Sequence, residues 1–190
     1  SLQSIILIKP LFTIIALLIS ILLPALTRAR QQAKSAVCLS NMRGIGLAIY
    51  AYANDQRDFL PGVGLSHGGS GEDIQGSWFT TLLKPYADPM LAICPTDESD
   101  HFTLPVNPTV PTSIRRVSYA SNYYTAAPIG NRKPYNRLSS FPKASTTVLY
   151  CELTGQGPYA AADHVHPEQW FSNPRLLAAE QVAIVRHGKT

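Results

Sequence analysis

The stretch Leu11-Phe12-Thr13-Ile14-Ile15-Ala16-Leu17-Leu18-Ile19-Ser20-Ile21-Leu22-Leu23 decides the fold of this 190-residue chain. No charged residue lies between Pro10 and Thr27, and Lys9 is the only charge before them. The stretch and its neighbours form an apolar region, 1–26, which is longer than the ~20 residues that an α-helix needs to cross a bilayer. Basic residues follow this region, whereas in a secretory signal peptide they precede a shorter apolar core. We therefore expect a lipid-compatible helix that stays in the protein.

Residues 27–54 have the pattern of an amphipathic continuation of that helix. Apolar side chains recur every three to five positions, and Arg28, Arg30, Lys34 and Arg43 occupy positions between them. If 1–53 form one helix with a kink near Pro24, its length is on the order of 80 Å at about 1.5 Å per residue. A bilayer needs much less, so the second half must pack on the rest of the chain. The residues expected to pack there are Val37, Met42, Ile45, Ile49 and Tyr52.

The charges divide the chain into two parts. Five of the sixteen Lys and Arg residues and none of the twelve Asp and Glu residues lie within 1–54. Beyond Asn54, eleven basic residues face twelve acidic ones. The formal net charge of +4 therefore belongs to the helix and not to a basic globular domain. We expect no nucleic-acid partner.

Three segments resemble type IV pilin-like proteins: Ile21-Leu22-Leu23-Pro24-Ala25-Leu26-Thr27-Arg28-Ala29-Arg30, Cys38-Leu39-Ser40-Asn41-Met42-Arg43-Gly44-Ile45-Gly46-Leu47-Ala48 and Tyr52-Ala53-Asn54-Asp55. More narrowly, the chain is similar to the bacterial branch that combines a prepilin-type N-terminal methylation helix with a His-x9-Asp-Gly head. This resemblance covers roughly the first 60 residues. Beyond them the matching pieces are Trp78 to Tyr86, Cys94-Pro95-Thr96-Asp97, Ser118-Tyr119 with Asn122, and Arg186-His187-Gly188.

The resemblance implies an α+β, pilin-like fold in which the long helix packs on a small antiparallel-sheet head. It implies a subunit that a prepilin peptidase processes, that sits in the inner membrane, and that pilus or secretion machinery assembles with identical copies into an extracellular type IV pilus-like filament. No catalysis, cofactor or small-molecule substrate is expected. The residues expected in the filament core are Leu11, Phe12, Ile15, Leu18, Ile19, Leu22, Leu23 and Pro24.

Some features depart from the family or leave alternatives open. Ile5 stands where pilin-like helices usually have a Glu, if the processed chain starts near Ser1. The basic residues after the span would place the head in the cytoplasm unless a basic leader precedes residue 1, as the family predicts. One alternative function is a pseudopilin of a type II secretion apparatus, which forms short periplasmic fibres. Another is a monomeric, membrane-anchored periplasmic binding protein or enzyme.

The domains that we predict are a stalk helix, 1–54, and a head, 55–190. The head carries most of the fifteen prolines and twelve glycines, which predicts many loops. A short helix is expected over 78–86. Runs rich in β-branched and aromatic residues predict strands within 116–124, 146–152 and 181–186.

Several side chains in the head could form a disulfide or bind a metal. Cys38, Cys94 and Cys151 allow one disulfide and one free thiol, with the pairing left open. His164 and His166 would share a face of a strand near Asp163 and Glu168, and Asp97, Glu98 and Asp100 offer oxygen ligands for Ca²⁺. Solvated loops are the preferred interpretation of both sets, so no metal is expected.

Two further segments carry weak functional patterns. Gly64-Leu65-Ser66-His67-Gly68 matches a nucleophile motif but lies in a glycine-rich stretch, which favours a flexible loop. Residues 103–113 combine prolines with Thr and Ser. They predict an extended loop, with O-linked sugar as the alternative.

Overall fold

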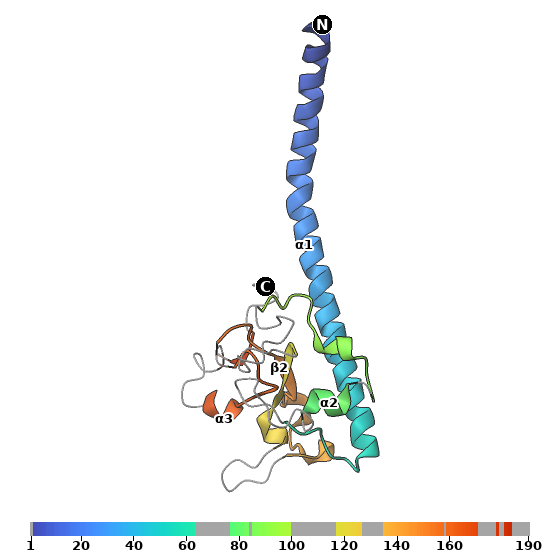
Figure 1. The fold of residues 1–190 in the computed structure, drawn as a ribbon, viewed down its shortest axis with the longest axis vertical. Helices are drawn as coiled ribbons and strands as arrows, with labels where there is room; N and C mark the ends of the chain where they lie inside the picture. Colours follow the sequence, from blue (N-terminus) through green and yellow to red (C-terminus); the bar gives the residue numbers. More distant parts are fainter. Residues whose placement is uncertain are drawn as a thin grey trace, which may run out of the picture.

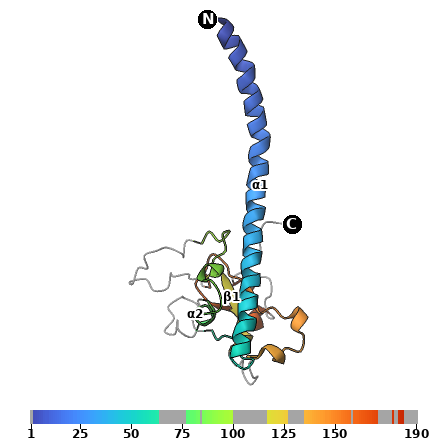
Figure 2. The same ribbon diagram turned by 90° about the vertical axis from the view of Figure 1, so that its right-hand side faces the viewer.

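Helix α1, Leu2–Asp55, runs without interruption from the N-terminal end of the protein into the head (Figure 1). The computed structural model describes residues 2–63, 77–83, 85–99, 117–126, 135–157, 159–170, 178 and 181–183, with the side chains of 2–11, 168 and 169 excepted. The N-terminal half of α1 projects away from the head, and the C-terminal half lies along it (Figures 1 and 2). The contact with the head begins later than the change in sequence pattern at residue 27, because residues 27–33 are still exposed and Cys38 is the first buried residue of α1 among those described.

The expected kink near Pro24 is not present as a sharp bend. The helix continues through Pro24, and Figure 2 shows a gradual curve in its projecting half. Proline removes the hydrogen bond that its N–H would donate to the Ser20 carbonyl, and its ring crowds that carbonyl, so the helix is expected to bend here. The structure takes up this strain as a gradual curve. Side chains also support the carbonyls nearby, since Ser20 Oγ donates to the Leu17 carbonyl and Thr27 Oγ1 to the Leu23 carbonyl.

The head consists of short elements joined by loops. Its helices and strands, in chain order, are α2 (Trp78–Leu82), η2 (Pro89–Ala92), β1 (Tyr119–Asn122), η5 (Tyr123–Thr125), η6 (Leu138–Ser140), η7 (Ala144–Thr146), β2 (Tyr150–Glu152), β3 (His164–Val165) and α3 (Pro167–Trp170), with η denoting a 3₁₀-helix. Asp88 and Asn122 cap η2 and η5, because their side chains accept hydrogen bonds from the backbone N–H two residues on. Local capping thus stabilises elements that are too short to be stable alone.

The sheet has three strands in the order β2-β1-β3. β1 pairs with β2 antiparallel, with Ala120 opposite Cys151, and with β3 parallel, with Ser121 opposite His164. The sheet is therefore mixed, where the sequence had predicted an antiparallel one. The reason is that residues 153–163 carry the chain from one side of β1 to the other, so that β3 runs in the direction of β1.

The core lies between the C-terminal half of α1 and the sheet. Trp78 and Tyr119 are its largest fully buried side chains, and the Trp78 ring packs edge-on against Tyr150 with 4.9 Å between centroids. The Trp78 indole N–H donates to the Asp163 carbonyl at 2.9 Å, which satisfies its polar atom inside the core. The buried residues of this cluster are Cys38, Ile45, Ala48, Ile49, Leu60, Trp78, Leu82, Leu83, Ala92, Cys94, Val117 and Tyr119.

The turn that ends α1 is fixed by contacts with a segment far along the chain. Arg57 and Asp58 have positive φ values of 53° and 75°, which is the left-handed conformation that ends many helices. The Asp58 carboxylate accepts hydrogen bonds from the backbone N–H and hydroxyl of Ser139, and the Arg137 guanidinium lies 4.1 Å from the Phe59 ring centroid. These contacts hold the strained turn in place.

The α+β, pilin-like layout predicted from the sequence is confirmed. α2 occupies the first part of the predicted 78–86 helix, and β1 and β2 lie inside two of the predicted strands. In the third predicted strand, 181–186, an isolated bridge joins Val182 to Leu153, and residues 184–186 lie outside the described residues. β3 had not been predicted.

Candidate functional site

The projecting half of α1 exposes large apolar side chains. Phe12 is 66% exposed and Ile19 48%, although free-standing apolar side chains of this size are normally covered. The predicted filament-core residues with described side chains are all exposed: Phe12, Ile15, Leu18, Ile19, Leu22, Leu23 and Pro24. Leu11 lies in the helix, but its side chain is outside the described residues. A surface of this composition requires a cover of lipid or protein.

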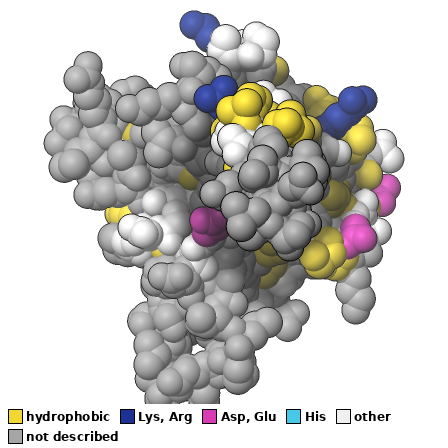
Figure 3. Space-filling model, turned by 90° about the horizontal axis from the view of Figure 1, so that it is seen from above, with side chains coloured by type: hydrophobic (Ala, Val, Ile, Leu, Met, Phe, Trp, Pro, Cys, Tyr) yellow, Lys and Arg dark blue, Asp and Glu magenta, His cyan; other side chains and the backbone are white. Residues whose placement is uncertain are grey.

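The exposed apolar surface extends around the helix and is not a single stripe. Consecutive residues such as Leu17, Leu18 and Ile19 point about 100° apart on a helix, and each of them is exposed. Seen from the N-terminal end, hydrophobic side chains lie beside Lys and Arg side chains at several positions (Figure 3). By length and composition the helix is able to cross a membrane. Only an environment that surrounds the helix covers such a surface.

One face of the C-terminal half of α1 packs on the head. Ile45 and Ile49 belong to the buried core, and Met42 and Tyr52 pack against it, where the sequence predicted them. Val37 is instead 48% exposed. It lies about 80° around the helix from Ile45, at the edge of the covered face. Three buried members of this face were not predicted: Asn41, Ala48 and Ala53. Cys38, a candidate for the disulfide, is buried there too.

Specific bonds hold this face in one register. Cys38 and Cys94 form a disulfide with 5.0 Å between their Cα atoms. The Asn41 amide donates to the Ile93 carbonyl at 2.9 Å, and the Tyr119 hydroxyl donates to the Cys38 carbonyl at 3.3 Å. The stalk and head are therefore joined covalently and by polar contacts in addition to the hydrophobic core.

Polar groups surround the disulfide. The Thr96 hydroxyl lies 2.9 Å from Cys94 Sγ and 3.6 Å from Cys38 Sγ. Glu152 Oε1, which comes from β2, lies 4.0 Å from Cys94 Sγ. Ligand atoms of Cys38, Cys94 and Glu152 all lie within 4.8 Å of one another, and among the described residues they are the one such trio of His, Cys, Asp or Glu.

His164 and His166 lie together, as the less favoured strand-face alternative would place them, and both are buried. Their ring centroids are 4.9 Å apart, and both rings contact Tyr123. His164 Nδ1 lies 2.8 Å from Asp163 Oδ1, and the His166 backbone N–H donates to Gln181 Oε1 at 2.7 Å. The pair is thus part of a packed aromatic and polar cluster, where solvated loop histidines had been the preferred interpretation.

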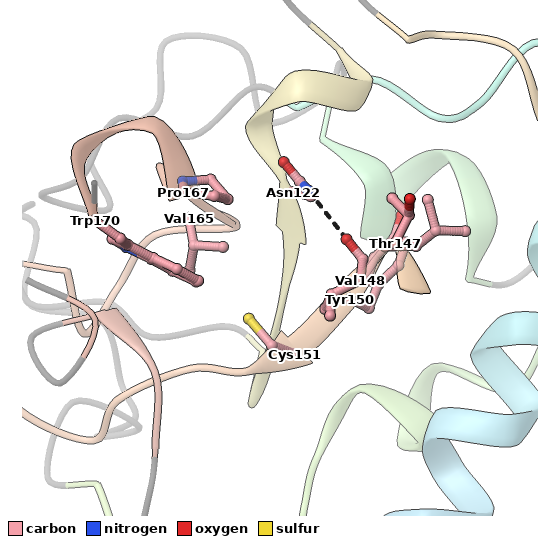
Figure 4. Close-up of a pocket in the computed structure, with 9 residues that line it drawn as sticks. Asn122, Thr147, Val148, Tyr150, Cys151, Val165, Pro167 and Trp170 are labelled. Carbon is pink, nitrogen blue, oxygen red and sulfur yellow. Dashed lines mark hydrogen bonds between the residues drawn. The ribbon is translucent and has the colours of Figure 1, made fainter. Parts of the chain in front are cut away.

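A pocket with a volume of about 250 Å³ lies between β2, β3 and α3 (Figure 4). Val165, Pro167 and Trp170 line one side, Val148 and the Cys151 thiol line the other, and the Asn122 amide donates to the Val148 carbonyl at 3.0 Å. Cys151 is not disulfide-bonded. Burial, and then the neighbouring Glu152 carboxylate, raise the pKa of its thiol to about 12. At neutral pH this sulfur is a protonated, weakly reactive thiol.

Burial also raises the pKa of two tyrosines in the core. For Tyr150 the largest cause is desolvation, followed by the Asp163 carboxylate and then Tyr52, and its pKa lies well above the ordinary value of 10.0. The pKa of Tyr52 is raised by burial and then by Tyr86, whose ring packs edge-on at 5.6 Å. Both phenols stay protonated under physiological conditions.

Of the remaining sequence candidates, the structure describes only Asp97 and Glu98. Asp97 lies in a turn in which its N–H donates to the Cys94 carbonyl, and Glu98 is exposed. Asp100, the 64–68 motif, residues 103–113 and Arg186-His187-Gly188 lie outside the described residues, as does the Glu168 side chain.

Comparison with known protein families, with curated proteins and with solved structures finds no match for this chain. The geometry of the helix and the head is therefore the basis on which its function is inferred.

Proposed function

We propose that this protein is a structural subunit that polymerises through the apolar half of α1 into an extracellular filament of the type IV pilus class. The observation that carries the proposal is the fixed relation between two surfaces of one helix. The helix that carries the exposed apolar surface, 12–26, continues without a break through the exposed residues 27–33 to a face that the core and the Cys38–Cys94 disulfide fix to the head.

A membrane anchor alone does not need this rigid continuity, because a flexible linker between anchor and head would serve it equally well. A helical polymer does need it. Each subunit repeats one heterologous contact, so its apolar surface and its head must keep the same relative orientation from copy to copy. The uninterrupted helix and its attachments to the head at Cys38, Asn41 and Ile45 meet that requirement.

The apolar surface suits both a membrane state and an assembled state. Residues 10–27 carry no charge and extend about 27 Å along a helix, close to the ~30 Å of a hydrocarbon core. Lys9 and Arg28 flank this span, at positions that suit the headgroup layers. On assembly, contacts with lipid are exchanged for contacts with identical helices. We therefore place the subunit in the inner membrane before assembly and at the cell surface afterwards.

The polar clusters of the head support a structural role. The disulfide joins α1 to the segment after η2, and the His164 ring contacts Asp163, Tyr123 and His166 inside the fold. These contacts stabilise the head, and the proposed filament assigns no catalysis to it.

A charge in the apolar segment tests the proposal. Ile19→Lys or Leu22→Lys places an unpaired cation in the helix bundle, at a cost of several kcal/mol per subunit. We expect filaments to be lost while the head keeps its disulfide and tryptophan fluorescence. The matched control is Gln32→Lys, which adds the same charge at an exposed position of the same helix beyond the apolar segment. Normal filaments from the Ile19→Lys protein would refute the buried-helix model.

A further inference from the structure

We propose that Cys38, Cys94 and Glu152 form a binding site for a thiophilic divalent cation, above all Zn²⁺, when the disulfide is open. Their ligand atoms lie within 4.8 Å of one another. Two thiolates and a carboxylate are a donor set that Zn²⁺ accepts, and a thiolate pair disfavours the hard cations Mg²⁺ and Ca²⁺. This inference goes beyond the filament and does not depend on it.

The three ligands come from three segments that the fold brings together. Cys38 lies on α1, Cys94 follows η2, and Glu152 ends β2. Both cysteines are buried and Glu152 is half-buried. In a tetrahedral zinc site, bonds of about 2.3 Å to sulfur and 2.0–2.2 Å to oxygen place neighbouring ligand atoms about 3.5–3.8 Å apart. Glu152 Oε1, at 4.0 Å from Cys94 Sγ, is already near that separation.

The surroundings of the sulfurs are suited to thiolates. Thr96 Oγ1 lies close to both sulfurs, at 2.9 Å from Cys94 Sγ and 3.6 Å from Cys38 Sγ. The hydroxyl is placed to donate a hydrogen bond that orients a metal-bound thiolate. Ser118 Oγ accepts a hydrogen bond from the Cys94 backbone N–H at 2.9 Å, which holds the Cys94 backbone in place. Two thiolates beside a carboxylate repel one another in a buried site, and a divalent cation relieves the repulsion.

The site exists only after the Cys38–Cys94 disulfide has been reduced. A dithiol reductant supplies two electrons and two protons, the Cys38–Cys94 bond becomes two thiols, and the reductant becomes a disulfide. Metal binding then releases the two thiol protons. The attachment between stalk and head is retained in both states, because a disulfide holds it in one and the metal holds it in the other.

The third cysteine provides a matched control. Cys151 precedes Glu152 in β2, and neighbouring side chains of a strand point to opposite faces. Its sulfur lines the pocket with Trp170 (Figure 4), whereas Glu152 Oε1 lies 4.0 Å from Cys94 Sγ. Cys151→Ser therefore removes a thiol without touching the proposed ligands.

The test uses the full chain in detergent, reduced with a phosphine under anaerobic conditions and titrated with Co²⁺. We expect one equivalent to bind with thiolate charge-transfer absorption in the near ultraviolet and tetrahedral d–d bands in the visible, and Zn²⁺ to displace it. Cys151→Ser keeps these bands. Cys38→Ser and Cys94→Ser each lose most of the charge-transfer intensity, and Glu152→Gln lowers the Co²⁺ affinity at least about tenfold.

Circular dichroism of the same samples shows whether the reduced chain is folded. If it is loosened by reduction, Co²⁺ or Zn²⁺ is expected to restore the oxidised spectrum, because binding to the folded state favours it. The proposal is overturned if reduced protein gives no thiolate band, whether folded or not, or if the band survives Cys38→Ser and disappears with Cys151→Ser. An unchanged affinity in Glu152→Gln overturns the role of the carboxylate.

Discussion

Gly44 on α1 lies directly under Leu91 of η2, so closely that a Cβ atom at Gly44 would be 2.7 Å from Leu91 Cδ1. At Gly46, about half a turn away, a Cβ atom would have no other atom within 4 Å. The two glycines therefore serve different purposes. Gly44 lets η2 approach the helix beside the disulfide, whereas nothing in the described structure requires a glycine at 46.

These two positions give a paired stability prediction. Gly46→Ala is expected to raise the free energy of unfolding by about 0.5–1 kcal/mol, because alanine loses less backbone entropy in a helix. The free energy of unfolding of Gly44→Ala is expected to be about 1 kcal/mol lower than that of Gly46→Ala, because Leu91 must leave its rotamer. Denaturant titration followed by tryptophan fluorescence measures both. Adding Leu91→Ala removes the clash, so Gly44→Ala should then stabilise, and equal gains at both glycines in the natural background would contradict the contact.

The disulfide is predicted to carry a measurable share of head stability. Cys38 and Cys94 are 56 positions apart in the sequence. Removing a disulfide that closes such a loop lowers the free energy of unfolding by about 2–4 kcal/mol, because the unfolded chain gains conformational freedom. The double variant Cys38→Ser with Cys94→Ser is expected to lose that amount in metal-free buffer. Cys151→Ser serves as the control and should stay within about 1 kcal/mol of the natural protein. Equal losses in both variants would contradict the assigned pairing.

Cys151 is predicted to react slowly with alkylating agents while the head is folded. A thiol with a pKa of about 12 has roughly two thousandfold less thiolate at pH 8 than an ordinary cysteine with a pKa near 8.5. A thiolate of higher pKa is also more nucleophilic, which offsets part of this difference. Iodoacetamide labelling, followed by mass spectrometry, should therefore be at least about tenfold faster in urea than in native buffer. Labelling at similar rates in the two conditions would show that the thiol is not buried in the pocket.

Much of the fold follows from local sequence pattern. The uncharged run before Thr27 and the i, i+4 spacing of Ile45 and Ile49 define the two halves of α1, because a helix brings residues at those intervals to one face. Ala48 and Ala53 were missed because small side chains give a weak periodic signal, although close packing against the head favours them. Val37 was expected on the packing face because only spacing was considered, and not the width of the surface that the head covers.

The rest depends on contacts between distant residues. The sequence allows a disulfide between any two of the three cysteines, and only the fold brings Cys38 to Cys94. β3 has two residues, and its pairing with Ser121 and Asn122 is what makes it a strand. The burial of His164 and His166 follows from that pairing and from Tyr123, so their local sequence beside Pro167 predicted a loop. No periodicity encodes such contacts.

Alkaline pH is predicted to destabilise the head through Tyr150. Its pKa is raised in the folded state, so above pH ~10 the unfolded chain releases a proton that the folded chain retains. The stabilising contribution is present below that pH and declines as the pH rises, by up to about 1.4 kcal/mol per pH unit for one group. Tyr150→Phe should show a shallower decline in unfolding free energy between pH 10 and 11 than the natural protein. Parallel declines would show that the phenol is solvated.

Cryo-electron microscopy of material sheared from the producing cells is the first test of the proposed filament. We expect filaments made of this chain, with residues 12–26 of α1 bundled along the axis and the heads outside. Such a map would also show how Arg28, Arg30 and Lys34 are neutralised by neighbouring copies. Finding the chain only as membrane-bound monomers would contradict the filament and favour an anchored protein, and fibres confined to the periplasm would contradict the extracellular location and favour a secretion pseudopilin.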